Sequence, residues 1–290
     1  MRKFINYIAI LFATIFLIMA VLDLVYTSVY EYSNPRNKFQ YILNLKPQKI
    51  NYIFLGSSRT ANSIVTSEVI KTSGLKAINL GMEGAQLDDN LLQLKLLLDK
   101  GVVADKIFLQ VDYQFENLKK SSIAKADAIP FIHNRIIKEH LEKEIEDFST
   151  MYYIPFYRYM VNDYKIGFRE FFFSIINKKP KIDLNDGFTP KKESRDLKEQ
   201  ILPNSIASRN LTIEKMQRLC DEKNIELVYF CAPFCSKVKN IEYVKKLKAK
   251  LPGLQDYSSA FKDSLFFDCG HLNDRGALLF TKLFIVKNKL

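Results

Sequence analysis

The sequence is poor in the residues from which metal and redox sites are built. It has three histidines and four cysteines among 290 residues, and the spacing of the cysteines fits no zinc-binding pattern. We therefore expect neither a bound metal nor another cofactor. Cys231 and Cys235 could form a disulfide, but Cys231 falls on a segment with the pattern of a buried strand. Free, buried thiols are the simpler expectation for Cys220, Cys231, Cys235 and Cys269.

The chain also lacks the signatures of nucleotide and nucleic-acid binding. No Gly-x-Gly-x-x-Gly or P-loop pattern follows its first expected strand, which ranks a nucleotide- or flavin-binding protein last among the candidate functions. The formal net charge is +11, which could suggest an anionic partner, but the basic residues are scattered along the whole chain. Nucleic-acid binding usually shows a concentrated basic stripe or a recognisable module, so we do not expect it here.

What the sequence does have, near its start, is a long apolar run. Phe4–Val21 carries no charge and is about 18 residues long, near the length that crosses a bilayer. Arg2 and Lys3 precede the run, which favours a cytoplasmic N-terminus. Tyr26 and Tyr30 follow it, where an aromatic belt at the membrane surface would place them.

A cleaved signal peptide is the alternative interpretation of this run. A signal peptide has a shorter apolar region with a small-x-small cleavage site after it, and Ala20-Val21-Leu22 is the nearest approach to such a site. The length and the flanks of the run favour an uncleaved transmembrane anchor within residues 1–30. Basic residues after the run, such as Arg36 and Lys38, blur its orientation. If Arg2 and Lys3 decide it, the rest of the chain lies outside the cytoplasm.

Beyond a polar stalk expected over residues 31–49, residues 50–290 show the alternation of strands and helices of an α/β domain. Strands are expected at Asn51–Leu55, Lys76–Leu80 and Lys106–Val111, with helices at Arg59–Thr72 and Leu87–Leu98 between them. Connections of about twenty residues and strands that are apolar throughout favour a parallel sheet with helices on both faces.

The alternation stops between about residues 114 and 205, which we interpret as a mainly helical, aromatic-rich insertion. Its aromatic faces could rest on lipid or line a substrate groove, or its helices could simply pack on the main core. The α/β pattern then returns. The expected elements are helices at Ile206–Asn224, Lys237–Lys250 and from Asp274 onward, and strands at Glu226–Cys231 and Leu254–Tyr257.

Two segments carry residues that suit a serine nucleophile and its base. Ser58 ends a strand and begins a helix, a place where parallel sheets bind ligands and where free N–H groups favour negative charge. Taken alone, it is most simply a helix N-cap. His133 and His140 lie on an expected charged, exposed helix. His271 instead follows an apolar run and has Asp268 three residues before it, close enough to fix its tautomer, although a turn with a helix cap would also explain this pair.

Three blocks of the sequence resemble the signature blocks of the SGNH (GDSL-type) hydrolase superfamily. Ile53-Phe54-Leu55-Gly56-Ser57-Ser58 resembles the block that ends in the nucleophile, with Ser57 in place of the usual Asp. Asn79–Gly84 resembles the second block, whose glycine, here Gly81, offers a backbone N–H to the oxyanion. Asp268-Cys269-Gly270-His271 resembles the final Asp-x-x-His block.

The resemblance covers roughly residues 50–113 and 205–290, and it is similar to one branch in particular. The Gly-Ser-Ser-Arg form, the N-terminal anchor and His-Leu-Asn-x-x-Gly-Ala at His271–Ala277 look like membrane-anchored accessory proteins of alginate O-acetylation and teichoic-acid D-alanylation. The resemblance implies a flavodoxin-like three-layer αβα fold, in which the last loop folds back over the nucleophile. It also implies a cell-surface polysaccharide or polymer as acceptor and a membrane-bound O-acyltransferase as partner.

The chain departs from the family at the third block, Gly-x-Asn-Asp, whose Asn completes the oxyanion hole. The third strand is followed instead by Asp112-Tyr113-Gln114-Phe115-Glu116-Asn117. Asn117 or Gln114 could supply the amide, and the loss of one oxyanion donor costs about 10²–10³ in rate. Arg59, next to the nucleophile, could hold an anionic substrate group or pair with a nearby acid.

The sequence therefore leads to two functional hypotheses. In the first, the protein is a serine esterase or O-acyltransferase with Ser58 as nucleophile, His271 as base and Asp268 as its orienting group, and the N–H groups of Ser58 and Gly81 bind the oxyanion. In the second, the fold is a catalytically inactive scaffold that binds a glycan or a membrane acyltransferase, which the absence of the third block favours.

Overall fold

The computed structural model has a mixed α/β architecture that divides into two compact units. Unit 1 comprises residues 1–41 and 125–180, and unit 2 comprises residues 42–124 and 181–290. The structure describes residues 1–116, 122–192 and 196–290.

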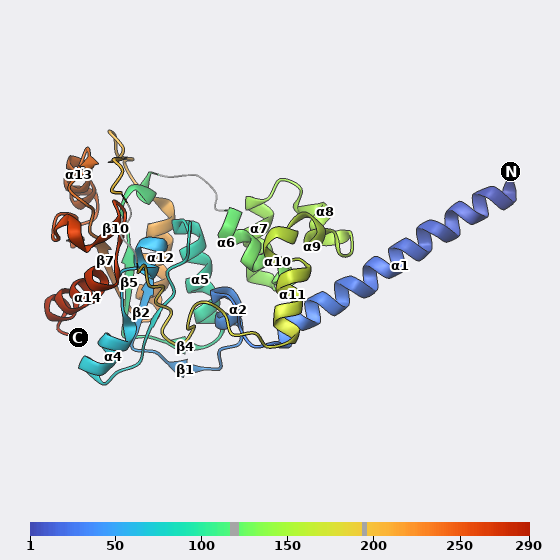
Figure 1. Cartoon of the computed structure of the whole chain (residues 1–290), viewed down its shortest axis with the longest axis horizontal. Helices are drawn as coiled ribbons and strands as arrows, with labels where there is room; N and C mark the ends of the chain where they lie inside the picture. The colour runs from blue at the N-terminus through green and yellow to red at the C-terminus, as the bar shows by residue number, and fades with distance from the viewer. Residues whose placement is uncertain (117–121, 193–195) are drawn as a thin grey trace. The chain divides into compact units, whose positions relative to one another are not determined.

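Unit 1 is built on the long N-terminal helix α1 (Arg2–Tyr32), which Figure 1 shows with the short helices of the unit beside its C-terminal part. In the part of the chain that the structure describes, α1 is the one helix that is long and apolar enough to cross a membrane. None of its most apolar stretch is buried, and a signal sequence can be equally long and apolar. The other helices around unit 1 are α2 (Lys38–Leu43), α6 (Ser122–Ala128), η2 (Ile129–Phe131), α7 (Arg135–Glu144), α8 (Phe148–Tyr153), α9 (Tyr157–Val161), α10 (Asp163–Ile166) and α11 (Phe168–Ile175).

Tyr26 and Tyr30 are buried inside unit 1, so the prediction that they face lipid as an aromatic belt is wrong. The Tyr26 ring stacks on Phe171 with their centroids 3.8 Å apart, and the Tyr30 ring stacks on Tyr159 at 6.0 Å. Tyr26 is 7% exposed and Tyr30 is 1% exposed. The rings that cover them come from the insertion, far along the chain, which a local sequence pattern does not reveal.

The polar stalk expected over residues 31–49 is folded for much of its length. α1 continues to Tyr32, and α2 follows it after a turn. The side chain of Gln40 closes this turn, because its Nε2 donates to the carbonyl of Tyr30 at 2.7 Å and its Oε1 accepts from the amide of Arg36 at 2.8 Å. Phe39 is fully buried, whereas a solvated stalk would leave its ring in water.

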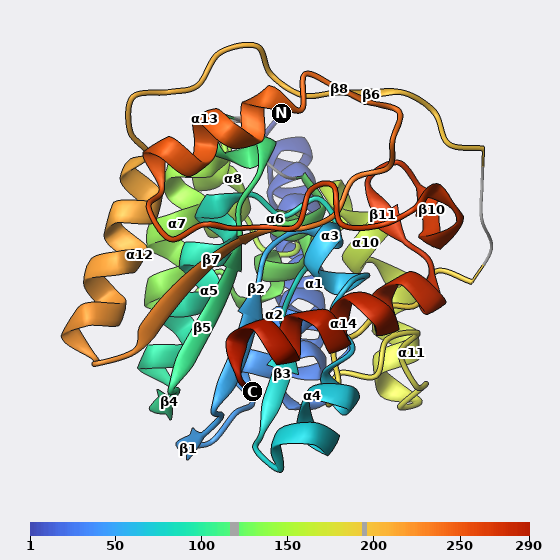
Figure 2. The same cartoon turned by 90° about the vertical axis from the view of Figure 1, so that its left-hand side faces the viewer.

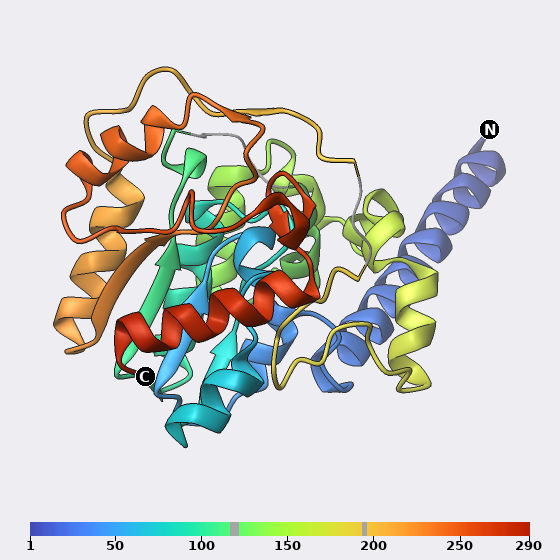
Figure 3. The same ribbon diagram turned by 60° about the vertical axis from the view of Figure 1, so that its left-hand side comes forward.

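Unit 2 contains a five-stranded parallel sheet in the order β3-β2-β5-β7-β9. Helices α4 and α14 lie on one face of the sheet and α5 and α12 on the other (Figures 2 and 3). Each strand expected from the sequence is present, with ends that differ by at most one residue. The strands are β2 (Tyr52–Leu55), β3 (Ala77–Asn79), β5 (Lys106–Gln110), β7 (Glu226–Cys231) and β9 (Gln255–Asp256).

The remaining elements of unit 2 are helices and three short strand pairs. The helices are α3 (Ser58–Ala61), α4 (Thr66–Ser73), α5 (Leu87–Asp99), η1 (Tyr113–Phe115), α12 (Leu211–Glu222), α13 (Glu242–Lys250), η3 (Asp263–Leu265) and α14 (Asp274–Asn288). The strand pairs are β1 (Gln48–Lys49) with β4 (Val102–Val103), β6 (Gln200–Ile201) with β8 (Val238–Lys239), and β10 (Phe266–Asp268) with β11 (His271–Leu272).

The expected helix Arg59–Thr72 is broken into α3 and α4. At the break, one side chain binds a distant backbone carbonyl, and one backbone amide is bound by a distant side chain in place of a helical carbonyl. Asn62 Nδ2 donates to the carbonyl of Thr189 at 2.7 Å, and the amide of Val65 donates to Thr281 Oγ1 at 2.9 Å. The break thus depends on partners from distant segments, which helix propensity does not predict.

Residues 181–205, expected in the insertion, group with unit 2, so the helical insertion that packs with α1 is only 125–180. The amide of Asn79 in the edge strand β3 donates to the carbonyl of Asp186 at 3.1 Å, and the amide of Thr189 donates to the carbonyl of Ala61 at 2.8 Å. Residues 186–189 therefore cover the edge of the sheet, where backbone groups would otherwise lack protein partners.

An aromatic cluster joins the sheet to α14. Phe284 is fully buried, and its ring packs edge-on against Phe108 at 5.0 Å, Phe230 at 5.2 Å and Phe54 at 5.8 Å between centroids. Because α14 directly follows the β10–β11 hairpin, this cluster also fixes where that hairpin ends.

We expect Phe284→Ala to lower the free energy of unfolding by about 3–5 kcal/mol, because it leaves a cavity among three strands. Val286→Ala on the same helix is the matched control, since Val286 is 76% exposed and should change stability little. Denaturant unfolding of the detergent-solubilised chain, followed by circular dichroism, measures both. Equal effects of the two substitutions would contradict this account of the core.

Candidate functional site

Ser58 lies at the carboxyl end of β2, in a turn that only glycine at position 56 permits. Gly56 has a φ of 151°, and a Cβ there would lie 2.7 Å from Cβ of Gln110. Ser57 caps α3, because its Oγ accepts from the amide of Arg59 at 3.2 Å. Ser58 is thus the first residue of this one-turn helix, while Ser57, which stands in place of the usual Asp, is buried beneath it.

Asp268 and His271 face each other across the β10–β11 hairpin, where they form a register pair. Residues 269 and 270 make the two-residue turn, and the amide of Gly270 donates to Asp268 Oδ1 at 2.9 Å. The spacing of the Asp-x-x-His block is therefore that of a tight hairpin, which brings both side chains to the same end.

The structure brings Ser58, His271 and Asp268 together. Ser58 Oγ is 2.7 Å from Nε2 of His271, and Nδ1 of His271 is 2.8 Å from Asp268 Oδ1. With the Nδ1–H donated to the carboxylate, Nε2 is the ring atom that can accept the hydroxyl proton of Ser58. The side chains of His271 and Asp268 are 24% and 37% exposed, so the group is open to an incoming molecule.

The carboxyl of Asp268 favours its charged form. Burial raises its pKa, but the hydrogen bond from His271, the charge of His271 and the backbone amides of Gly270 and His271 together lower the pKa below its usual value. Asp268 therefore remains a carboxylate near neutral pH, as orientation and stabilisation of an imidazolium require.

The expected oxyanion donors differ in how they are placed. Among the residues that the structure describes, none accepts a hydrogen bond from the amide of Ser58. The amide of Gly81 donates to Asn79 Oδ1 at 2.9 Å, so an oxyanion would share or replace that bond. Nε2 of Gln114 donates to a backbone carbonyl before α5 at 2.6 Å, and Asn117 lies outside the described residues.

Gly81 also lies against the turn that carries the nucleophile. A Cβ at this position would be 2.8 Å from the carbonyl oxygen of Ser57 and 2.5 Å from the amide nitrogen of Ala61. Only glycine permits this approach of the segment after β3 to the start of α3. The position expected from the second block is therefore beside Ser58 in space, whatever its part in chemistry.

Arg59 points into the protein and away from solvent. It is 1% exposed, and its Nε forms an ion pair with Asp112 Oδ2 at 2.6 Å. Its Nη1 donates to the carbonyl of Gly270 at 2.8 Å and its Nη2 to that of Ala232 at 2.6 Å. The guanidinium lies 3.5 Å above the ring centroid of Phe234. Of the two roles considered for Arg59, the structure gives it the pairing with an acid.

Asp112 and Gln110, at the end of β5, are residues of the site that the sequence did not single out. Gln110 Nε2 donates to Asp112 Oδ2 at 2.6 Å, and Gln110 Oε1 accepts from Ser57 Oγ at 2.8 Å. Burial raises the pKa of Asp112, and the positive charge of Arg59 opposes that rise. A buried polar chain thus runs from Ser57 to Arg59. The sequence signal for this hydrogen-bonded network was Gln110 and Asp112, two polar residues at the end of an otherwise apolar strand.

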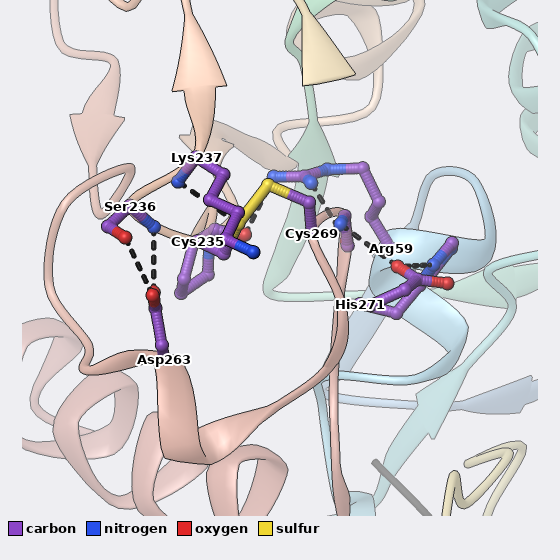
Figure 4. The surroundings of a disulfide bond; sticks show 10 residues. Arg59, Cys235, Ser236, Lys237, Asp263, Cys269 and His271 are labelled. Atoms are coloured by element: carbon purple, nitrogen blue, oxygen red, sulfur yellow. Dashed lines mark hydrogen bonds and ion pairs between the residues drawn. A yellow bond between two sulfur atoms is a disulfide. The ribbon is translucent and has the colours of Figure 1, made fainter. Parts of the chain in front are cut away.

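A disulfide between Cys235 and Cys269 corrects the expectation of four free thiols (Figure 4). Cys220 and Cys231 are free and buried, so the considered pair of Cys231 with Cys235 does not form. The bond ties the segment after β7 to the turn of the β10–β11 hairpin, beside His271. Residues 34 positions apart meet only through the fold, which sequence spacing did not reveal.

The other candidate features lie elsewhere. His133 and His140 belong to unit 1, so His271 is the one histidine of unit 2. Within residues 1–116, 122–192 and 196–290, no group of three or more His, Cys, Asp or Glu side chains is placed to hold a metal ion.

Comparison with known proteins adds no family assignment. No protein-family model matches the chain, and no curated protein matches it either. The resemblance to the SGNH superfamily therefore depends on the three sequence blocks, and any chemistry depends on the geometry of Ser58, His271 and Asp268.

Alkylation of the unfolded chain tests the disulfide. We expect two alkyl groups without reductant, on Cys220 and Cys231, and four after reduction, as measured by mass spectrometry of protein isolated from an oxidising compartment. Uptake of four groups before reduction would show that Cys235 and Cys269 are not bonded.

Substitution of Arg59 tests the buried ion pair. Arg59→Met should lower the free energy of unfolding by about 3–5 kcal/mol, because Asp112 is left buried without its counter-charge. Adding Asp112→Asn should recover part of the loss. Arg209→Met, which removes an exposed ion pair with Glu214, serves as control and should have little effect. An Arg59→Met chain as stable as the parent would refute the ion pair's structural role.

Proposed function

We propose that this chain is a membrane-anchored serine esterase or O-acyltransferase of the SGNH type that acts on a cell-surface glycan or polymer. One observation carries the proposal: Ser58 Oγ is 2.7 Å from Nε2 of a histidine whose Nδ1 is 2.8 Å from a carboxylate. These distances lie within the hydrogen-bond range expected of a nucleophile, its base and the orienting group.

The order of the strands supports the SGNH interpretation of the fold. Numbered along the chain, the main-sheet strands β2, β3, β5, β7 and β9 lie in the order 2-1-3-4-5, which is the flavodoxin-like order. In such sheets, ligands bind beyond the carboxyl ends of the strands near the point where the order reverses. That point lies between β2 and β5, and Ser58 follows β2 there.

In the proposed reaction, the acyl group passes through Ser58. Its Oγ forms a bond to the acyl carbonyl carbon while its proton moves to Nε2 of His271. The tetrahedral intermediate then breaks the ester C–O bond, and His271 returns the proton to the leaving oxygen. Water or an acceptor hydroxyl attacks the acyl-enzyme in the same way, and Ser58 recovers its proton. The amide of Ser58, joined by that of Gly81, would hold the negative oxygen.

An extracytoplasmic location agrees with two observations. α1 is long and apolar enough to cross a bilayer, with Arg2 and Lys3 on its N-terminal side. The Cys235–Cys269 disulfide is of a kind that persists mainly in oxidising compartments. A chain held in this way at the extracytoplasmic face of the membrane would meet surface polymers. The partner that the resemblance suggests is a membrane-bound O-acyltransferase.

The second candidate is a catalytically inactive scaffold that binds a glycan or a membrane acyltransferase. The observation that favours it is the amide of Gly81, which donates to Asn79 and is thus not displayed as a sole oxyanion donor. The two functions differ in whether Ser58 reacts.

A serine-reactive fluorophosphonate probe tests the enzyme directly. The folded, full-length chain should be labelled at Ser58, and Ser58→Ala should abolish both the labelling and any ester hydrolysis or polymer acylation. Ser67→Ala is the matched control, because Ser67 is an exposed serine on α4 and should not change labelling. Peptide mapping locates the label. A folded parent chain that takes up no probe would support the scaffold instead.

A further inference from the structure

Unit 1 exposes a set of large apolar side chains that its own core does not need. We call them the collar: Tyr153, Ile154, Tyr164, Phe168 and Phe172. Tyr153 is 73% exposed, although Phe148 on the same helix is buried, and Phe168 is 67% exposed. Clusters of exposed, large apolar side chains often mark a binding surface.

Asp23 marks where the apolar part of α1 ends. It is the first charged residue after Lys3, and the side chains between them are apolar or uncharged and largely exposed. The insertion binds α1 at this point. Asp23 Oδ1 accepts from the amide of Phe156 at 2.7 Å, and Asp23 Oδ2 pairs with Arg158 at 2.9 Å. Tyr153 and Ile154 lie three and two residues before Phe156, so they lie near the level of Asp23.

Helix α11 places Phe168 toward the same end of the insertion. Two contacts give the direction of α11. Phe171 stacks on Tyr26, and further along both segments Asn34 donates to Asn177 at 3.1 Å, so α11 runs in the same general direction as α1. Phe168 lies three residues before Phe171, which moves it back by about 4.5 Å. Phe168 therefore lies on the Asp23 side of the Tyr26–Phe171 stack. Figure 1 shows α11 beside α1.

The remaining collar residues extend this surface. The rings of Phe168 and Phe172 stack at 6.2 Å between centroids. Tyr164 is next to Asp163, whose Oδ1 accepts from the amide of Phe168 at 3.2 Å. Arg169, also exposed, follows Phe168 and adds a positive charge at the same helix end. Tyr164, Phe168 and Phe172 therefore form one part of the collar, in which tyrosine and phenylalanine lie beside a basic residue.

We propose that the collar lies in the headgroup region of the bilayer that α1 crosses, and that it rests the insertion on the membrane surface. A lipid interface is favoured over a protein partner because the collar lies where the uncharged span of α1 ends, and aromatic side chains concentrate at that depth. The Asp23–Arg158 pair fits the same place, because each charge has its counter-charge as it approaches lipid. The inference depends on α1 spanning the membrane and not on the chemistry of Ser58.

The absence of tryptophan from the chain allows a direct test. Phe168→Trp and Tyr153→Trp each create a single tryptophan in the full-length protein, which is placed in vesicles of phosphatidylcholines brominated near the glycerol end and near the middle of the acyl chains. We expect both to lose fluorescence to a similar extent as Phe12→Trp, inside the apolar span. Tyr32→Trp is the control outside the bilayer: Tyr32 is 86% exposed and about 13 Å beyond Asp23, further than the headgroup layer reaches.

The outcomes separate the possible partners of the collar. Quenching at positions 168 and 153, but not at 32, supports contact with lipid. If positions 168 and 153 are unquenched by bromolipid while position 12 is quenched, the inference is overturned, whether aqueous iodide reaches the two positions or a second protein shields them. If position 12 is also unquenched, α1 does not span the vesicle membrane, and the proposed anchor falls with the collar. Probe labelling of Ser58 is independent of all three results.

Discussion

The buried ion pair of Arg59 and Asp112 is the constraint on which the geometry of the candidate site depends. Arg59 belongs to the turn after β2, Asp112 to the end of β5, and the carbonyls that the guanidinium binds belong to Ala232 after β7 and to Gly270 in the hairpin. A guanidinium without solvent must satisfy its donors within the protein, so these four segments hold one another in place. His271 follows Gly270 directly, and its distance to Ser58 is set by this arrangement.

The hairpin that carries Asp268 and His271 is also held from its other sides. The disulfide of Cys269 fixes its turn to the segment after β7. At its end, Asn273 caps α14 by accepting from the amide of Gly276 at 2.9 Å, and a Cβ on Gly276 would lie 2.2 Å from the carbonyl oxygen of Leu265. The His-Leu-Asn-x-x-Gly-Ala segment thus has a structural explanation: it ends the hairpin and starts the helix whose aromatic face packs on the sheet.

The sequence predicted what local pattern determines. Five apolar runs gave the strands of unit 2, and the Asp-x-x-His spacing anticipated a carboxylate beside the imidazole because a two-residue hairpin is a local structure. It missed what depends on distant partners. The Cys235–Cys269 bond, the burial of Tyr26 and the roles of Gln110 and Asp112 each require contacts between segments far apart in the chain. The sequence left the role of Arg59 undecided, because its partner Asp112 follows another strand.

The arrangement around Gly81 bears on how fast the proposed chemistry would be. Asn79 is fully buried, and its Nδ2 donates to the carbonyls of Thr60 and Ile64, both at 2.9 Å, so its Oδ1 is held in place to accept the amide of Gly81. An oxyanion would therefore compete with a fixed acceptor, and the amide of Ser58 would carry more of the charge. One weakened donor costs up to about 10²–10³ in rate. Such a site suits an acyl transfer in which enzyme and polymer are kept together at one surface, because proximity offsets part of that loss.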